Sequence, residues 1–359
     1  MTAEPRIEIT ATGWVDRADS AFPKAVQLAD GDVLCSYSNA GGSWATGGTG
    51  LSRSRDGGRT WTREADILPG TTEPRSSNFL KPSVAPDGVT VYAYGSRSGD
   101  HAGLEFGERE AVSVLCTSRD GGRTWSAPAE VPMPSRLLEV SDAALVTRSG
   151  RLLAPAATIE PDHLGERVVL AISDDGGRSW PRSTTCLRDP DGRLGYLEQK
   201  LTELPDGRLL ATAWTATMAG LVDRSNSFAL SADGGLTWSP PRSIGTMGQT
   251  LSVTPLGGDR LLVLYNRRYG RQGVVIAIAR LDEQGPWPIL WEGLVHDAAA
   301  SRERAAGADA IEEMKAFAFG FPTAVRLADG ELLATWWQSL DGDPLGTTGV
   351  AYARLRVVG

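Results

Sequence analysis

In this 359-residue chain, the residues that could carry out hydrolysis are carboxylates acting in pairs. Cleavage of a glycosidic bond takes two facing carboxyl groups, one protonated as a general acid and one ionised as a base or nucleophile. Glu198 begins a predicted strand and is the first candidate, and Glu139 and Asp142 near the start of an earlier strand come second. Five further carboxylates occupy comparable positions: Asp16, Asp19, Asp100, Glu160 and Asp162. For each of these residues, a solvated loop side chain is the alternative.

Three lysines share one position relative to a predicted turn. Lys24, Lys81 and Lys200 each precede the aspartate of an Asp-Gly turn by six residues. Three lysines around one channel would bind an anionic substrate such as a uronate or a phosphate. The alternative is that they only blunt the edges of the inner strands. Side chains that could add positive charge or stack on a sugar complete the predicted binding set: Arg97, Arg267, Arg268, His101, Trp214 and Trp337.

The elements that must position these side chains follow from two interleaved repeats. The segment Ser-x-Asp-Gly-Gly-x-Thr/Ser-Trp occurs four times, with its aspartate at Asp56, Asp120, Asp175 and Asp233. Such a turn offers a carboxylate to backbone N–H groups and glycines that tolerate positive φ. A second repeat, two apolar strands around a turn, is centred at 30–31, 87–88, 149–150, 206–207, 257–258 and 329–330. Repeats of this period indicate a propeller or a solenoid.

Combining the two repeats predicts an all-β, six-bladed β-propeller that takes up residues 1–359 as a single domain. Residues 6–11 are expected to supply the missing strand of the last blade, which leaves no open sheet edge. The tight turns fall on one face of the disc and the long loops on the other, where function is expected. Residues 297–315 are rich in Ala, Glu and Arg and predict one helical insertion between blades 5 and 6, either a lid or a helix on the rim.

The fourfold motif resembles the Asp box, or BNR repeat, of the sialidase (neuraminidase) superfamily, and the resemblance spans most of the chain. It implies that the Asp boxes are markers of architecture on the face away from the chemistry. In sialidases as a family, three arginines bind the substrate carboxylate, a tyrosine assisted by a glutamate is the nucleophile, and an aspartate is the acid/base. Of these groups, the register retains the glutamate at Glu198 and allows one arginine in the segment 266–271.

The remaining family residues are missing. The register places Ala21-Phe22-Pro23 and Trp214 where two arginines are expected, and Phe321-Pro322 where the tyrosine is expected. The segment 38–49, where the aspartate belongs, holds no carboxylate. We therefore expect a glycoside hydrolase-like enzyme that acts through a carboxylate pair on a glycoside that is acidic or neutral, and not by the usual sialidase mechanism. A lyase or a cyclising biosynthetic enzyme with Lys or His as the base is one alternative, and a non-catalytic glycan- or protein-binding propeller is another.

Composition narrows the choice of partner. The net charge of −8 and the lack of a basic run argue against nucleic acid and anionic membranes. No signal peptide or apolar run of spanning length is visible, so a cytoplasmic location is expected. Cys35, Cys116, Cys186 and three histidines are too scattered for a disulfide framework or a metal site. We expect no cofactor and no metal, and a small molecule or glycan as substrate; the oligomeric state is left open.

Overall fold

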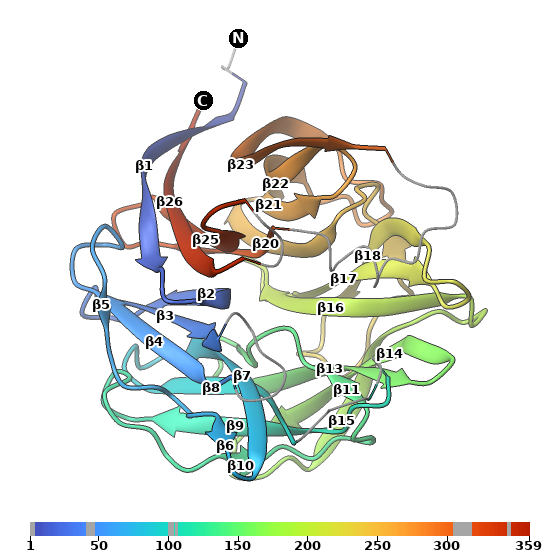
Figure 1. Cartoon of the computed structure of the whole chain (residues 1–359). Coiled ribbons are helices and arrows are strands. Elements are labelled where there is room, and N and C mark those ends of the chain that lie inside the picture. The colour runs from blue at the N-terminus through green and yellow to red at the C-terminus, as the bar shows by residue number, and fades with distance from the viewer. Residues whose placement is uncertain (1–3, 41–46, 100–103, 105–106, 304–317, 343–345) are drawn as a thin grey trace.

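Six antiparallel sheets form a ring around a common axis in the computed structural model (Figure 1). The structure describes residues 4–40, 47–99, 104, 107–303, 318–342 and 346–359. Every regular element in these residues is a strand, so the prediction of an all-β six-bladed propeller is confirmed. It follows that none of these elements is a helix with the length and apolar character of a membrane span.

Each blade contributes its first strand to the axis and its last to the rim. Blade 1 consists of β2 (Ala21–Gln27), β3 (Val33–Ser38), β4 (Thr49–Ser54) and β5 (Thr62–Arg63). Blade 2 consists of β7 (Arg75–Val84), β8 (Val91–Ser98), β9 (Ala111–Ser118) and β10 (Ala129–Glu130), with β6 (Thr71–Thr72) beside β7. Blade 3 consists of β11 (Leu138–Glu139) and β12 (Leu145–Val146), both paired with β13 (Leu152–Glu160), followed by β14 (His163–Ser173) and β15 (Arg182–Arg188).

The last three blades follow the same order. Blade 4 consists of β16 (Leu194–Glu203), β17 (Leu209–Thr217), β18 (Asp223–Ser231) and β19 (Arg242–Ser243). Blade 5 consists of β20 (Gln249–Gly257), β21 (Arg260–Arg267), β22 (Gly270–Arg280) and β23 (Ile289–Arg302). Blade 6 consists of β24 (Phe319–Arg326), β25 (Leu332–Ser339), β26 (Thr348–Val358) and β1 (Arg6–Asp16).

The N-terminal strand completes the sixth blade. Strand β1 pairs antiparallel with β26, from Arg6 opposite Val358 to Asp16 opposite Val350. The two ends of the described chain consequently lie side by side at the rim (Figure 1). This pairing covers the edge that β26 would otherwise expose.

The predicted helical insertion is wrong over the part of it that the structure describes. Residues 297–302 continue strand β23, with Asp297 opposite Gly273 and Arg302 opposite Gly270 of β22. Arg271 of β22 also forms an ion pair with Asp297. Helix propensity is a weak preference that tertiary pairing overrides, and here the long β22 hairpin provides that pairing. The rest of the predicted helix, 304–317, lies outside the described residues.

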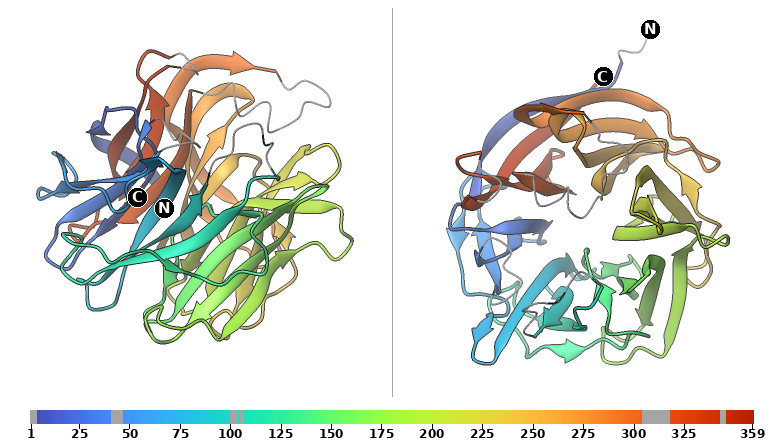
Figure 2. Two further views of the ribbon diagram at one scale, coloured as in Figure 1. Left: turned by 60° about the horizontal axis from the view of Figure 1, so that its bottom comes forward. Right: turned by 45° about the vertical axis from the view of Figure 1, so that its right-hand side comes forward.

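The apolar core lies in layers between neighbouring blades, which the turned views in Figure 2 show as facing sheets. Leu34 and Leu51 of blade 1 pack with Leu80 and Cys116 of blade 2, and all four are at most 1% exposed. Because each sheet is covered on both faces, strands such as β3 and β4 are buried at every residue, including their serines. The three cysteines are free and buried within these layers.

The Asp boxes are turns held by their own aspartate. In the first box, Ser54 Oγ donates to Asp56 at 2.7 Å, and Thr60 donates from its backbone N at 2.8 Å and its Oγ1 at 2.7 Å. Although burial opposes ionisation, these bonds lower the pKa of Asp56 to about 2. The aspartate is therefore fully occupied by its own turn and has a structural role.

The same boxes also connect neighbouring blades through arginine side chains. Arg53 of blade 1 donates to Gly121 O in the box of blade 2 at 2.7 Å, and Arg151 of blade 3 donates to Gly234 O in the box of blade 4 at 2.9 Å. Arg354 of blade 6 donates to Gly57 O in the box of blade 1. The turn carbonyls thus hold neighbouring sheets in register on this face of the ring.

Candidate active site

Four innermost strands each contain one residue with the same strained backbone conformation. Phe22, Glu198, Thr250 and Phe321 have φ values of 54°, 51°, 53° and 53°, in the left-handed region that side chains other than glycine rarely adopt. Each lies where the pairing between the first two strands of its blade shifts register. A bulge of this kind redirects a side chain and is found next to active sites. The repetition at four blades points to the axis as the functional centre.

Glu139 and Glu198 meet at this centre. Glu198 donates its backbone N–H to Glu139 Oε2 at 2.9 Å, and the side-chain amide of Gln199 donates to Glu139 O at 3.2 Å. Thr250 Oγ1 donates to Glu198 Oε2 at 2.6 Å. Burial and the charge of Glu198 raise the pKa of Glu139 to about 7. The backbone of Glu198 thus holds the Glu139 carboxyl group, and the raised pKa leaves Glu139 partly protonated at neutral pH.

Asp142 and the neighbouring Ser141 each bind one of the lysines at the same centre. Lys24 Nζ lies 2.9 Å from Asp142 Oδ1, and the Leu201 N–H lies 3.3 Å from Asp142 Oδ2. Lys200 Nζ donates to Ser141 O at 2.6 Å. Burial opposes the ionisation of Asp142, but Lys24 and Lys200 hold its pKa below the usual value. Asp142 is thus a buried, paired anion and not a second proton donor.

Lys81 lies beside them on an aromatic surface. Its ammonium nitrogen is 5.1 Å from the centroid of the Phe321 ring, and that of Lys200 is 4.0 Å from the same ring. The Phe22 ring contacts Phe321 edge-on with centroids 5.6 Å apart, and it contacts Phe79 in the same way at 6.0 Å. Burial, and then the positive charge of Lys200, lower the pKa of Lys81 to about 7.

Arg268 closes the centre on the side of blade 5. It is 7% exposed, and it donates from Nε to Gln249 Oε1 at 2.9 Å and from Nη1 to Phe319 O at 3.0 Å. Its guanidinium also lies over the Phe319 ring, 5.2 Å from the centroid. Burial lowers the pKa of Arg268 to about 10, against the attraction of Glu198. It is the predicted arginine that lies near the carboxylate pair.

Among the other predicted binding residues, Arg267 and Trp214 have partners away from this centre. Arg267 forms an ion pair with Glu292 on the outer strand of its blade at 3.0 Å, and Arg97 is exposed on β8. Trp214 is 2% exposed in the core and donates to Asp223 Oδ1 at 2.7 Å, so it is a packing residue here. Trp337 does lie near the axis, 6.2 Å from the Phe22 ring between centroids. His101 lies outside the described residues.

Sequence reasoning missed the polar and aromatic partners that complete the centre. Thr250, Gln249 and Gln199 are each 1% exposed and form hydrogen bonds with the predicted residues. The Phe321 ring contacts the lysine ammonium groups, and the Phe22 ring packs against Phe321. A signal was present, because Thr250 and both phenylalanines occupy the same position of the repeat as Glu198, at the register shift of an innermost strand. Among the described residues, no group of three or more His, Cys, Asp and Glu side chains could hold a metal ion.

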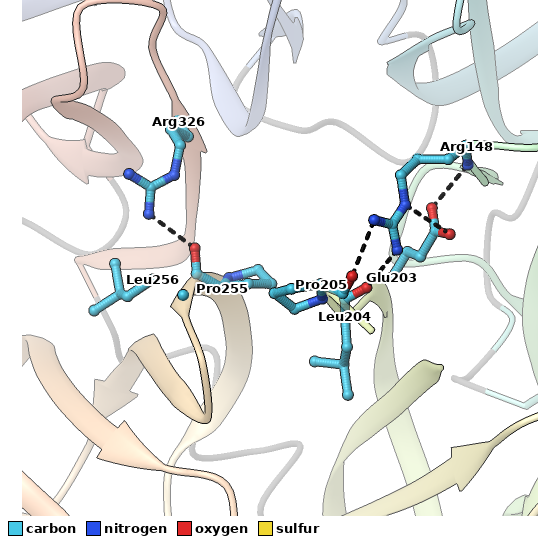
Figure 3. A pocket seen from close by; sticks show the side chains of 8 residues that line it. Arg148, Glu203, Leu204, Pro205, Pro255, Leu256 and Arg326 are labelled. Atoms are coloured by element: carbon cyan, nitrogen blue, oxygen red, sulfur yellow. Dashed lines mark hydrogen bonds and ion pairs between the residues drawn. The ribbon is translucent and has the colours of Figure 1, made fainter. Parts of the chain in front are cut away.

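A separate hollow lies at the other end of the axis, among the turns that join first and second strands (Figure 3). It has a volume of about 410 Å³ and is lined by Arg148 and Arg326 among others. Arg148 donates to Leu204 O at 2.7 Å, and Arg326 donates to Pro255 O at 3.0 Å. Both guanidinium groups thus hold backbone carbonyls of the turns, so this hollow is a structural feature of the ring.

A family model and curated relatives agree with this architecture. The model described as a BNR repeat-like domain matches residues 90–333. A sialidase of Micromonospora viridifaciens is 29% identical over 241 residues, 61% of this chain and 36% of that protein. A sialidase of Bacteroides fragilis is 27% identical over 273 residues, 66% of this chain and 47% of that protein. The chain therefore spans only about a third to a half of the length of these relatives.

Solved structures share the fold at lower identity. A protein of unknown function from Dyadobacter fermentans superposes with a TM-score of 0.75 at 20% identity, over 98% of this chain and 99% of that one. The NanB sialidase of Streptococcus pneumoniae gives 0.67 at 12% identity over 98% and 70%, and the GH93 α-L-arabinofuranosidase of Fusarium graminearum gives 0.65 at 16% over 97% and 98%. At these identities the likeness concerns the fold alone. The family match, the four Asp boxes and the six-sheet ring together show that this chain belongs to the BNR repeat-like domain family, within the sialidase-like propeller superfamily.

Proposed function

We propose that this chain is a glycoside hydrolase in which Glu139 and Glu198 form the catalytic carboxylate pair. The observation that carries the proposal is the contact between them: Glu139 accepts the N–H of Glu198 at 2.9 Å, and burial with the nearby Glu198 charge raises the pKa of Glu139 to about 7. A carboxylic acid that keeps its proton near neutral pH next to a second carboxylate is the arrangement that glycoside hydrolysis requires.

The two residues take different roles in this proposal. Glu139 donates its proton to the glycosidic oxygen as the bond to the anomeric carbon breaks. Glu198 is the second carboxyl group and either attacks the anomeric carbon or removes a proton from the attacking water. Thr250, whose hydroxyl lies 2.6 Å from Glu198 Oε2, orients the carboxylate. The relatives named as sialidases and the similarity to an arabinofuranosidase support a glycoside as the substrate class.

The experiment compares Glu139→Gln and Glu198→Gln on a panel of aryl glycosides with good and poor leaving groups. Loss of a general acid or base lowers kcat by about 100- to 10,000-fold on poor leaving groups. A dinitrophenyl leaving group needs no proton, so it restores turnover to Glu139→Gln and not to Glu198→Gln. Glu130→Gln, a change of an exposed carboxylate on the rim strand β10, is the control and keeps wild-type activity. Unchanged turnover in both active-site variants would refute the proposal.

A lyase is the second candidate, because Lys81 could be its base. A lysine with a pKa near 7 in a buried site removes a proton effectively at neutral pH. The two candidates differ in product and in pH dependence. A lyase leaves a new carbon–carbon double bond and gains activity as Lys81 loses its proton above pH 7. The hydrolase adds water and loses activity above pH 7 as Glu139 ionises.

A further inference from the structure

Lysine is rare in this chain and concentrated at one place. The sequence has 36 Lys and Arg residues, of which only four are lysines: Lys24, Lys81, Lys200 and Lys315. The first three lie on the innermost strands β2, β7 and β16. Arginine is not a nucleophile in proteins, because its guanidinium group keeps its proton, whereas a lysine amine can lose it. Within the described part of the chain, amine chemistry is therefore available only at the axis.

One of these three lysines is not held by an oxygen atom. Lys24 Nζ lies 2.9 Å from Asp142 Oδ1, and Lys200 Nζ donates to Ser141 O at 2.6 Å. Lys81 is 3% exposed, and it forms neither a hydrogen bond nor an ion pair with the residues that the structure describes. Once Lys81 has lost its proton, its nitrogen lone pair is consequently free to react.

The surroundings of Lys81 favour the uncharged amine. Its nitrogen lies 5.1 Å from the centroid of the Phe321 ring, which packs edge-on against the Phe22 ring. The charged groups that act on it are two cations and two carboxyl groups: Lys200, Lys24, Asp142 and Glu139. Burial is the largest influence and the positive charge of Lys200 the next, and they lower the pKa of Lys81 to about 7 against the two carboxyl groups. About half of the molecules therefore carry an uncharged amine here at neutral pH.

The charges at the axis are balanced without a bound anion. The Lys200 ammonium group next to Lys81 faces three carboxyl groups: Asp142, Glu198 and Glu139. The ligand that suits Lys81 is consequently an uncharged electrophile. A lysine amine that is desolvated in an apolar site, or that lies next to another cation, is activated for attack on a carbonyl carbon. Lys81 meets both conditions.

We propose that Lys81 is a nucleophile that forms an imine with the carbonyl carbon of a small, uncharged aldehyde or ketone. This activity goes beyond the proposed hydrolase and does not replace its two glutamates. The 3% exposure of Lys81 limits its partner to short molecules such as glycolaldehyde, glyceraldehyde and hydroxyacetone. The carbon chain of such a molecule packs on the Phe321 and Phe22 rings beside the amine.

The reaction is a condensation that needs no oxidant and no reductant. The lone pair of the Lys81 amine adds to the carbonyl carbon, and one proton passes from the nitrogen to the oxygen, which gives a carbinolamine. Glu139 then protonates the hydroxyl group, which leaves as water while the nitrogen lone pair forms the C=N bond. Burial and the charge of Glu198 raise the pKa of Glu139 to about 7, so it can both give and take back this proton. The products are a protonated imine, an ionised Glu139 and water, and the Phe321 ring stabilises the charge of the imine.

The test traps the imine with sodium cyanoborohydride, which reduces it to a stable secondary amine. Wild-type protein, either folded or in guanidinium chloride, is incubated at pH 7 with glycolaldehyde, glyceraldehyde or hydroxyacetone, and peptide mass mapping measures the label on each lysine. In the unfolded chain, where the lysine pKa is 10.5, only about one Lys81 amine in 3,000 is uncharged at pH 7, against about half in the folded chain. We expect at least one compound to label Lys81 tenfold or more faster in the folded protein, and Lys24 and Lys200 to be labelled more slowly there than in the unfolded chain.

Two variants serve as controls. Lys81→Met removes the amine but keeps a side chain of similar length, and it should lose the fast label without transferring it to Lys24 or Lys200. Arg97→Met, a change of an exposed residue on β8, should be labelled as the wild type is.

Other outcomes overturn the inference. If none of the three compounds labels Lys81 faster in the folded protein than in guanidinium chloride, the fold does not activate this amine. If the fast label is on Lys24 or Lys200, the nucleophile is a different residue. Because trapping needs no glycoside, it is separate from the hydrolase proposal. A trapped Lys81 together with unchanged turnover in Glu139→Gln and Glu198→Gln would contradict the catalytic pair alone.

Discussion

Replacing Lys81 by methionine should make the folded protein more stable, and the gain should shrink as pH rises. Lys81 is 3% exposed, and its pKa falls from 10.5 in an exposed side chain to about 7 in the folded protein, through burial and the charge of Lys200. The unfolded chain therefore binds this proton more tightly than the folded chain does. Stability consequently rises with pH between about 7 and 10.5, where the unfolded state binds more protons.

The size of the effect follows from the two pKa values. With 10.5 unfolded and about 7 folded, the lysine destabilises the fold by about 4 kcal/mol at pH 7.5 and about 2 kcal/mol at pH 9. Methionine has a similar length, carries no charge and fills irregular apolar space. The stability difference between Lys81→Met and wild type should therefore narrow by about 2 kcal/mol across this range. Glu139, with its pKa of about 7, changes its contribution mainly below the range.

The assay is urea unfolding of both proteins at pH 7.5, 8.25 and 9, with the free energy of unfolding extrapolated to water. Lys24→Met is the matched control. It removes a lysine of the same centre but leaves Asp142, 2% exposed, without its ion pair at 2.9 Å. Breaking a buried pair costs about 3–5 kcal/mol, so this variant should be less stable than wild type.

Two results would refute the reasoning. One is a Lys81→Met variant no more stable than wild type at pH 7.5, which would mean that the ammonium group is well solvated or paired. The other is a stability gain that is equal at pH 7.5 and pH 9, which would attribute the gain to apolar packing and not to the lowered pKa of Lys81.

Three further changes have separable effects. Asp56→Ala should lower the free energy of unfolding by about 1–2 kcal/mol, because the first Asp box loses its turn acceptor, while sugar binding at the opposite face stays unchanged; unfolding and calorimetry check the two halves. Thr250→Val should lower kcat by about tenfold or more through loss of the hydroxyl that orients Glu198, while Thr250→Ser retains activity. Arg53→Met should cost about 3–5 kcal/mol in urea unfolding, because two carboxylates and the Gly121 carbonyl lose a fully buried partner.

The ring of blades could be predicted because its information is local. An Asp box needs only eight consecutive residues, and the bonds that Asp56 receives come from Ser54 and Thr60 within the same turn. The period of these turns then sets the number of sheets. The segment 297–302 shows the limit, since its composition favours a helix, but pairing with β22 is a tertiary contact that no local pattern records.

The candidate site was only partly predictable for a related reason. Register places Glu198, Lys81 and Lys200 on innermost strands, and the structure brings them together. The register of the repeat cannot show which neighbouring groups form hydrogen bonds or ion pairs with a side chain. Trp214 is buried in the core with its indole N–H on Asp223, and Arg267 forms a partly exposed ion pair with Glu292. Asp223 lies on the strand next to Trp214 and Glu292 lies two strands from Arg267, so contacts across the strands of one blade decide where these side chains lie.

The aromatic residue at the start of β24 gives the strongest reason to separate this centre from a sialidase mechanism. Phe321 keeps the strained backbone, with φ of 53°, at the position where the family resemblance implies a tyrosine nucleophile. A phenylalanine has no hydroxyl for which such strain would be retained. Its ring instead faces the ammonium groups of Lys81 and Lys200, at 5.1 Å and 4.0 Å, and so stabilises positive charge that burial opposes. The bulge therefore presents an aromatic ring in place of a hydroxyl, and in our proposal the chemistry belongs to Glu139 and Glu198.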